Sequence, residues 1–181
     1  MSELQNKRIA IIATDYFEEA ELVQPLEALQ EAGATVDVIA PHEGTIKGLN
    51  HVDPGKEVPV TKTFADADPN DYDGLIVPGG AVNADNLRVV PEAQDFLIAM
   101  LAEQEKPTAI ICHGPWLLAS TGLARGRKLT SFHTIKDDLL NAGAEWVDEA
   151  VVQDGTIITS RQPDDLPVFI DTFKRALSER D

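Results

Sequence analysis

The sequence is nearly devoid of cysteine, because Cys112 is the single cysteine among 181 residues. One cysteine cannot form a disulfide within the chain, and the N-terminal residues lack the long apolar stretch of a secretory signal. No apolar run approaches the roughly 20 residues that a membrane-spanning helix needs. These absences predict a cytoplasmic protein with no membrane partner.

Basic residues are also scarce. The chain has 15 Lys and Arg against 31 Asp and Glu, which gives a formal net charge of −16 at pH 7. Such a charge repels phosphate backbones and anionic lipid headgroups, so we expect no nucleic-acid partner. The acids are spread along the chain, a distribution that is equally typical of a solvated surface, so the charge alone identifies no substrate.

Sequence motifs of common cofactor sites are missing as well. Neither glycine-rich phosphate fingerprint, G-x-G-x-x-G or G-x-x-x-x-G-K-[ST], occurs, and there is no C-x-x-C or H-E-x-x-H. The histidines have no close pairing along the chain: His42, His51, His113 and His133. We therefore expect no metal ion, no nucleotide and no other cofactor.

What the sequence does contain is a repeated alternation of buried strands and helices. Continuous apolar runs without two-residue alternation indicate strands covered on both faces; they occupy 7–14, 34–41, 72–80 and 107–115. Helical spacing occupies 18–33, with Pro25 as a kink or late start, and 91–106, 114–122, 135–144 and 164–177. Hairpin-like strands are expected within 41–70 and around the Asp-Gly turn of 149–160. This order predicts an α/β three-layer sandwich with a mostly parallel, flavodoxin-like central sheet.

The cysteine lies where one buried strand ends and a helix is expected to begin. The segment AIICHGP (109–115) runs from that strand directly into Cys112. Ligands of open parallel sheets bind beyond the carboxyl ends of the strands, and a sharp strand-to-helix turn presents the nucleophile there in some hydrolases. A helix N-terminus beside the sulfur would lower the thiol pKa. Cys112 is thus either a reactive nucleophile or, like many lone cysteines, a small buried core residue.

The two residues after the cysteine complete the predicted turn. His113 is either a base that exchanges a proton with the sulfur or a helix-start residue satisfied by the backbone, because sequence neighbours need not face the same way. Gly114 would let the backbone approach closely at the turn, and we expect it to line the oxyanion pocket. Only geometry distinguishes the two interpretations of His113.

Longer segments around this turn resemble a known family. The segments are AIICHGPWLLAS (109–120), GLARGRKLTSF (122–132), IKDDLLNAGAEWVDE (135–149) and TSRQPDDLPVF (159–169). They resemble the PfpI intracellular protease family of the ThiJ/PfpI superfamily, most closely its bacterial general stress protein branch. The resemblance extends from Arg8 almost to the C-terminus, and it implies a single ThiJ/PfpI-like domain over residues 1–181 that forms at least a homodimer.

The resemblance also implies a carboxyl partner for the sulfur. DYFEEAEL (15–22) is similar to the family's first loop, in which a glutamate after a phenylalanine approaches the cysteine, and this position maps onto Glu18. A neutral Glu18 would then hydrogen-bond a thiolate. The alternative is that Glu18 is an ordinary acid at a helix start, the role that we assign to Glu19 and Glu21.

A second matching segment, VPGGAVNADNLR (77–88), is expected to form another part of the pocket around Cys112. By resemblance, the Gly79 and Gly80 turn lines the pocket and aims backbone N–H groups at a developing oxyanion. Protease-type members place a glutamate shortly after this turn that reaches the histidine of a neighbouring subunit. The matching residue is Asp85, a shorter acid, which would orient His113 across the dimer.

These residues predict an enzyme in which the Cys112 thiolate attacks an electrophilic carbonyl and His113 moves the proton. The resemblance implies three carbonyl chemistries that share this first step: peptide hydrolysis, glyoxalase-type hydration, and deglycase removal of early glycation adducts. The substrate would be a small carbonyl compound, a peptide or a protein. The main alternative is a redox-responsive protein of oxidative stress in which Cys112 is oxidised without turnover. A holdase would require an exposed apolar patch.

Overall fold

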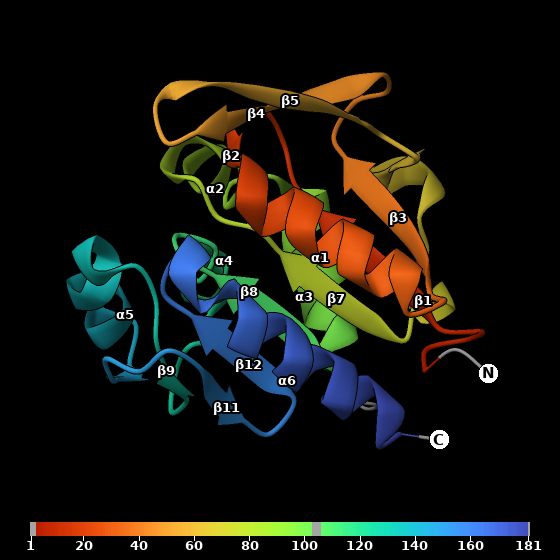
Figure 1. Ribbon diagram of the computed structural model, residues 1–181. Helices are drawn as coiled ribbons and strands as arrows, with labels where there is room; N and C mark the ends of the chain where they lie inside the picture. The colour runs from red at the N-terminus through yellow and green to blue at the C-terminus, as the bar shows by residue number, and fades with distance from the viewer. Residues whose placement is uncertain (1–2, 103–105, 181) are drawn as a thin grey trace.

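A computed structural model describes residues 3–102 and 106–180. Its main sheet is built from β1 (Arg8–Ile12), β3 (Thr35–Ala40), β6 (Lys62–Thr63), β7 (Gly74–Val77), β8 (Thr108–Ile111), β11 (Val152–Asp154) and β12 (Ile157–Ser160). The strands lie in the order β11-β12-β8-β7-β1-β3-β6 (Figure 1). The β11–β12 pair is antiparallel, and the other neighbouring pairs of this sheet are parallel. The predicted α/β fold with a mostly parallel sheet is confirmed.

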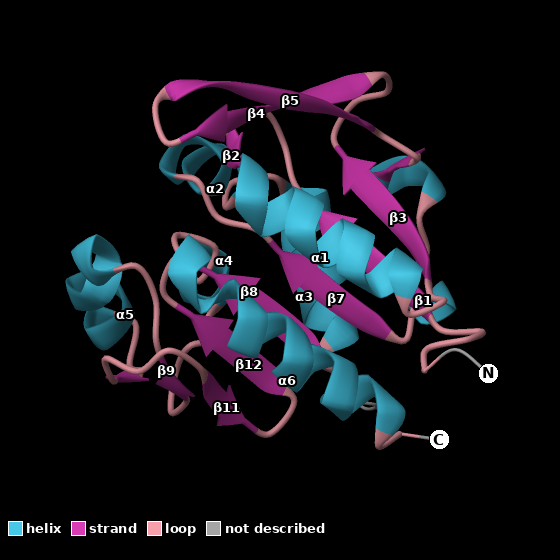
Figure 2. Ribbon diagram, in the orientation of Figure 1, coloured by secondary structure: helices cyan, strands magenta, loops and turns pink. Residues whose placement is uncertain are grey.

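Helices cover both faces of this sheet, as Figure 2 shows. The helices of the described residues are α1 (Glu19–Glu31), α2 (Ala81–Leu87), α3 (Pro91–Met100), α4 (Trp116–Thr121), α5 (Lys136–Asn141) and α6 (Leu166–Ser178). Helices α1 and α6 lie side by side on one face, while α3 and α4 lie on the other. Within the described residues, no helix combines the length and the apolar character that crossing a bilayer requires.

The absence of two-residue alternation in β1 follows from this arrangement. Ile9 and Ile11 pack in the hydrophobic core that contains residues of α1 and α6. Ala10 and Ile12 pack in the core on the opposite face, with residues of α3 and α4. Successive side chains of a strand point to opposite faces, so a strand with both faces covered is apolar throughout. Burying each isoleucine contributes about 1.5–3 kcal/mol relative to exposing it.

The irregular stretch after β3 forms the predicted hairpin. β4 (Thr45–Asn50) and β5 (Asp53–Pro59) are antiparallel, and β4 also pairs with β2 (Phe17–Glu18) in a separate small sheet. Figure 1 shows this hairpin across the top of the molecule, on the side toward which the arrow of β3 points. His51 at its turn has a φ of 59°, a left-handed conformation that is uncommon outside glycine and asparagine. Because β3 and β8 run in the same direction in the sheet, the hairpin lies at the sheet end that carries Cys112.

Several details differ from the sequence-based expectations. Helix α1 begins six residues before Pro25, so the late start is wrong, and α2 was not predicted. The helix expected over 91–106 ends at Met100, and residues 103–105 of that prediction lie outside the described part of the chain. The remaining short elements are β9 (Lys128–Leu129), β10 (Glu145–Trp146) and 3₁₀ turns at Phe64–Asp66, Pro69–Asp71, His133–Ile135 and Pro163–Asp165.

Candidate active site

Cys112 occupies a sharp turn at the carboxyl end of β8. Its φ is +65°, and hydrogen bonds hold the residue on both sides: its N–H donates to Ser160 O (3.0 Å), and its C=O accepts from Phe132 N–H (2.8 Å). A Cβ at Gly114 would lie 2.9 Å from Ile111 O, so the chain leaves the turn through space that only glycine fits. Such backbone strain in an L-residue persists only where the surrounding structure enforces it, and it is concentrated at functional sites.

The sulfur has polar neighbours although the residue is only 7% exposed. Sγ lies 3.2 Å from Nδ1 of His113, and the backbone N–H groups of Gly80 and His113 donate to it. The Glu21 carboxyl also contacts the sulfur. Cys112 is therefore buried, as the core interpretation requires, but it sits among donors and acceptors that an inert core residue does not need.

The carboxyl that meets the sulfur belongs to Glu21, three residues after the predicted Glu18. Glu21 lies in the first turn of α1, where we expected an ordinary helix-start acid, but its side chain is fully buried. Its Oε1 accepts the N–H of Gly79 at 2.9 Å, and among the described residues Oε2 has no well-oriented hydrogen-bond partner. Glu18 instead lines the cavity and accepts the backbone N–H of His51 at 3.2 Å.

Burial controls the protonation of this group of side chains. It raises the pKa of Glu21 to about 8, with the charge of Glu18 adding to the shift. Burial, followed by the charge of Glu21, also raises the pKa of the Cys112 thiol, against the opposing effect of the two N–H donors. Burial and the nearby His133 lower the pKa of His113. At neutral pH the His113 imidazole is therefore uncharged, and the Glu21 carboxyl is protonated.

The prediction that a helix N-terminus lowers the pKa of the thiol is wrong. Helix α4 has only six residues, and its first N–H group, that of Trp116, donates to the His113 carbonyl. The N–H groups that do reach the sulfur, those of Gly80 and His113, come from the turns before α2 and α4. Their stabilisation of a thiolate is smaller than the desolvation penalty of the buried site.

The ring of His113 is held in place from three directions. It stacks on Phe132 with ring centroids 4.9 Å apart, and it meets the Trp116 ring edge-on at 5.3 Å. Its Nε2 lies 3.4 Å from Oγ1 of Thr134. An Nε2–H that donates to Thr134 leaves Nδ1 as the acceptor that faces the sulfur.

The predicted oxyanion donors are only partly available. The N–H of Gly79 donates to Glu21, and the N–H of Gly114 donates to Ile111 O at 2.9 Å, so neither points at a substrate position. Gly80 has a φ of +88°, and a Cβ there would lie 2.6 Å from the backbone nitrogen of Glu18. The donors left beside the sulfur are the N–H groups of Gly80 and His113.

A cavity of about 480 Å³ opens onto this group of residues. The residues of its wall that bear on the chemistry are Glu18, Glu21, His51, Cys112, His113 and Asp164. Asp85 does not line it; that residue lies on α2 with an exposed side chain. Over residues 3–102 and 106–180, no group of three or more His, Cys, Asp or Glu side chains is arranged to hold a metal ion.

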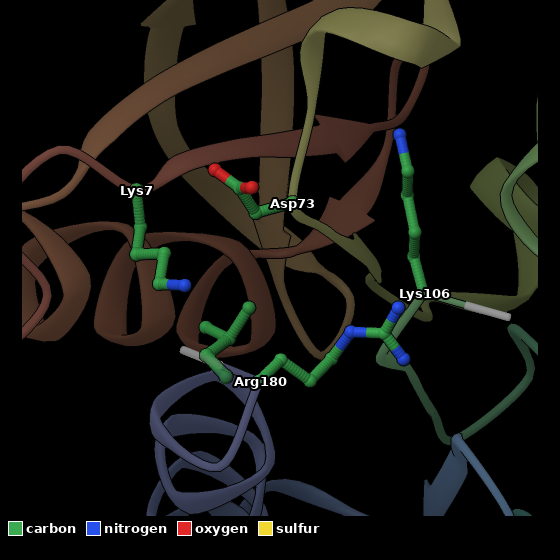
Figure 3. Close-up of a pocket in the computed structure, with 5 residues that line it drawn as sticks. Lys7, Asp73, Lys106 and Arg180 are labelled. Carbon is green, nitrogen blue, oxygen red and sulfur yellow. The ribbon is translucent and has the colours of Figure 1, made fainter. Parts of the chain in front are cut away.

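A second, smaller cavity of about 150 Å³ lies at the other end of the sheet (Figure 3). Its wall is formed by residues next to strand starts and a helix end: Lys7 before β1, Asp73 before β7, Lys106 before β8 and Arg180 after α6. Figure 3 shows the Lys106 side chain extending away from the Arg180 guanidinium. This cavity is not part of the site around the cysteine.

Comparison with known proteins agrees with this geometry. The model of the DJ-1/PfpI family matches residues 7–176. The chain belongs to this family. Among its relatives, "Deglycase TK1284" of Thermococcus kodakarensis is 39% identical over 170 residues, which cover 94% of this chain and 99% of the relative. "Putative cysteine protease YraA" of Bacillus subtilis is 40% identical over 164 residues, which cover 91% and 94%.

Solved structures show the same fold in the family. A two-domain protein of Anabaena variabilis, with DJ-1/ThiJ/PfpI-like and ferritin-like domains, superimposes with a TM-score of 0.90 at 34% identity. The match covers 95% of this chain and 48% of that protein, so this chain spans about half the length of the two-domain protein. The family likeness therefore concerns the α/β fold that carries Cys112.

Proposed function

We propose that this chain is a cysteine-dependent enzyme that attacks electrophilic carbonyl groups through Cys112. The observation that carries the proposal is the contact between Sγ and Nδ1 of His113, 3.2 Å apart at the wall of a cavity. A nucleophile within hydrogen-bond reach of an oriented base is the arrangement of covalent catalysis. The relatives named "Deglycase TK1284" and "Putative cysteine protease YraA" support an activity of this kind.

In the first step, the thiol proton of Cys112 passes to Nδ1 of His113, whose lowered pKa makes it an uncharged acceptor at neutral pH. The sulfur forms a bond to the carbonyl carbon as the C=O π bond opens. The N–H groups of Gly80 and His113 are the donors placed to stabilise the oxyanion. Protonated Glu21 avoids like-charge repulsion with the sulfur during the attack.

The later steps depend on what is attached to the carbonyl carbon. Where a C–N bond breaks, the imidazolium of His113 gives its proton to the leaving amine, and water then releases the acyl group and restores the thiol. A cavity of about 480 Å³ has the size of a small-molecule site, and it accommodates a small carbonyl compound or a modified side chain. We therefore rank deglycase-type chemistry first and peptide hydrolysis second.

The test is a substrate panel assayed with the full chain in amine-free buffer, because amines consume dicarbonyl compounds. The panel contains methylglyoxal, the methylglyoxal adducts of N-acetyl-lysine and N-acetyl-arginine, and a fluorogenic peptide. We expect turnover of a carbonyl compound or adduct that is abolished by prior alkylation of Cys112. Equal rates for the native and the alkylated protein across the panel would refute the proposal.

Thr134 is expected to position His113. Thr134→Val keeps the side-chain shape and removes the hydroxyl that faces Nε2, so the competing imidazole tautomer becomes more populated. We expect kcat to fall roughly three- to tenfold with KM unchanged, because a neutral hydrogen bond contributes about 1 kcal/mol and Thr134 does not line the cavity. Thr45→Val, on β4, is the matched control. A KM effect without a kcat effect would contradict this role.

A homodimer in which Asp85 orients His113 of the partner remains a proposal. Its support within this chain is that Asp85 is exposed on α2 and therefore accessible to a second copy. We expect light scattering to give a dimer or larger assembly, and Asp85→Asn to lower kcat roughly tenfold or more without dissociating it. A fully active monomer, or an Asp85→Asn dimer with unchanged kcat, would exclude the shared site.

A further inference from the structure

The wall of the cysteine cavity carries acidic side chains without basic ones. Glu18 and Asp164 contribute carboxylates, and Glu21 lies beneath them against the sulfur. The other titratable residues of the wall are His51 and His113, and no Lys or Arg is among the described residues that line it. A concave site lined by one sign of charge concentrates ligands of the opposite sign.

Residues 162–164 form one segment of the cavity wall, and the cationic residue that precedes them in the sequence is already paired with other acids. Arg161 immediately precedes this segment, but its Nε and Nη2 donate to the two oxygens of Asp165, each at 3.0 Å. Its Nη1 donates to Asp148 at 2.9 Å. Two carboxylates therefore offset its charge, and it does not offset that of Asp164.

Glu18 is fixed rather than free to turn toward bulk water. Its side chain is 12% exposed, its Oε1 accepts the N–H of His51 at 3.2 Å, and Nδ1 of the same histidine lies 3.8 Å away. The buried Glu21 lines the same cavity, and among the described residues its Oε2 has no well-oriented hydrogen-bond partner. Glu18, which is partly desolvated, acts on a nearby charge more strongly than an exposed carboxylate such as that of Asp164.

We propose that Glu18 and Asp164 make this cavity select carbonyl substrates that carry an ammonium or guanidinium group over anionic ones. The inference rests on the proposed function, because it assumes that the substrate approaches Cys112 through this cavity. A carbonyl adduct on a lysine or arginine side chain, or a carbonyl compound with a free amine, has the required charge. Carboxylated carbonyl compounds are disfavoured by the same two side chains.

Charge selection can be measured at the sulfur itself, without any turnover. Three methanethiosulfonates share one reacting group: the trimethylammonium-ethyl reagent is cationic, the methyl reagent neutral and the sulfonatoethyl reagent anionic. The Cys112 thiolate displaces methanesulfinate and forms a mixed disulfide with each. Since the chain has a single cysteine, every label reports Cys112. Rates are measured by mass spectrometry at pH 8 and divided by those of 2-mercaptoethanol.

The normalised rate ratio of the cationic to the anionic reagent is expected to be roughly tenfold or more at low salt. Glu18→Gln should lower it roughly threefold, and Asp164→Asn should lower it by a smaller factor because Asp164 is exposed. Added 0.5 M NaCl shortens the screening length to roughly 4 Å and should reduce the ratio further. Gln keeps an acceptor for the His51 N–H. Asp95→Asn, exposed on α3 outside the cavity, removes the same net charge and should leave the ratio unchanged.

The outcomes separate this inference from the proposed function. A ratio near one with all three reagents reacting would overturn the charge selection and leave Cys112 as an accessible nucleophile. An equal drop in Asp95→Asn would also overturn it, because the effect would then come from overall charge. Failure of all three reagents to label Cys112 would contradict both proposals.

Discussion

Cys112→Ala is expected to lower kcat/KM for every carbonyl substrate of this protein by about a thousandfold or more. The sulfur is the atom that would bond to the substrate, and no other cysteine can replace it because the chain has only one. Folding should be little affected, since alanine fits the buried turn and removes one small buried group at a cost of about 1 kcal/mol. The measurement is steady-state kinetics beside thermal unfolding.

Cys112→Ser is the matched variant, because it keeps a polar atom next to His113 and Glu21 while replacing the thiol with a poorer nucleophile. We expect nearly the same loss of turnover. Full activity in either variant would eliminate the cysteine mechanism. If the native protein turns over nothing in the panel while mild peroxide converts Cys112 to sulfenic or sulfinic acid, the redox-sensor alternative is supported and the enzyme is refuted.

Glu21→Gln is expected to remove a large pH dependence of stability. In the native protein the pKa of Glu21 is raised to about 8, whereas in the unfolded chain it is near 4.5. The folded state therefore binds more protons between these values, and the free energy of unfolding falls as pH rises through this window. A shift of this size is worth roughly 4 to 5 kcal/mol across the window.

The lowered pKa of His113 makes the free energy of unfolding rise with pH near the titration of that histidine, opposite to the effect of Glu21. Comparing the pH dependence of the native protein with that of the variant removes this contribution, because both proteins contain His113. Glutamine resembles the protonated acid: its oxygen can accept from Gly79 and its amide can face the sulfur. Denaturant unfolding at pH 5 and pH 8.5 should show a clearly smaller pH effect in Glu21→Gln than in the native protein or in Glu27→Gln, an exposed acid of the same helix. Parallel curves for all three proteins would show that Glu21 is not the titrating group.

The same variant should make the thiol easier to ionise. The charge of Glu21 is the second cause, after burial, of the raised pKa of Cys112. Without that carboxylate, the rate of labelling by the neutral methyl reagent at pH 9 should rise, because a larger fraction of the thiol is ionised. An unchanged labelling rate would show that the charge of Glu21 does not contribute to the raised thiol pKa.

The main elements of the fold were predictable because their signals are local. The apolar runs at β1, β3, β7 and β8 report strands with both faces covered, and Gly33, Gly122 and the helical spacing mark where helices end. Helix α2 was missed because its seven residues carry no cap signal. The helix is held in place by the buried Asn83, which accepts the N–H of Thr14 and donates to Gly79 O.

The carboxyl partner of the sulfur was misassigned although a sequence signal for it existed. Glu21, Pro25 and Leu29 are spaced four residues apart and are all buried, so an acid at position 21 falls on the apolar stripe of α1. An acid on that stripe is unusual and indicates a functional site. Glu18 precedes the helix and faces the cavity and the hairpin instead.

The sequence by itself determined the order of the main strands and helices, the position of Cys112 at a strand end and the family resemblance, because periodicity and turn chemistry act over a few neighbouring residues. The tertiary structure alone decided which carboxyl meets the sulfur, which backbone N–H groups stay available, and that the pKa of the thiol rises. Those properties depend on desolvation and on groups brought together from β2, α1, the turn before α2 and the end of β8, and no local pattern encodes such contacts.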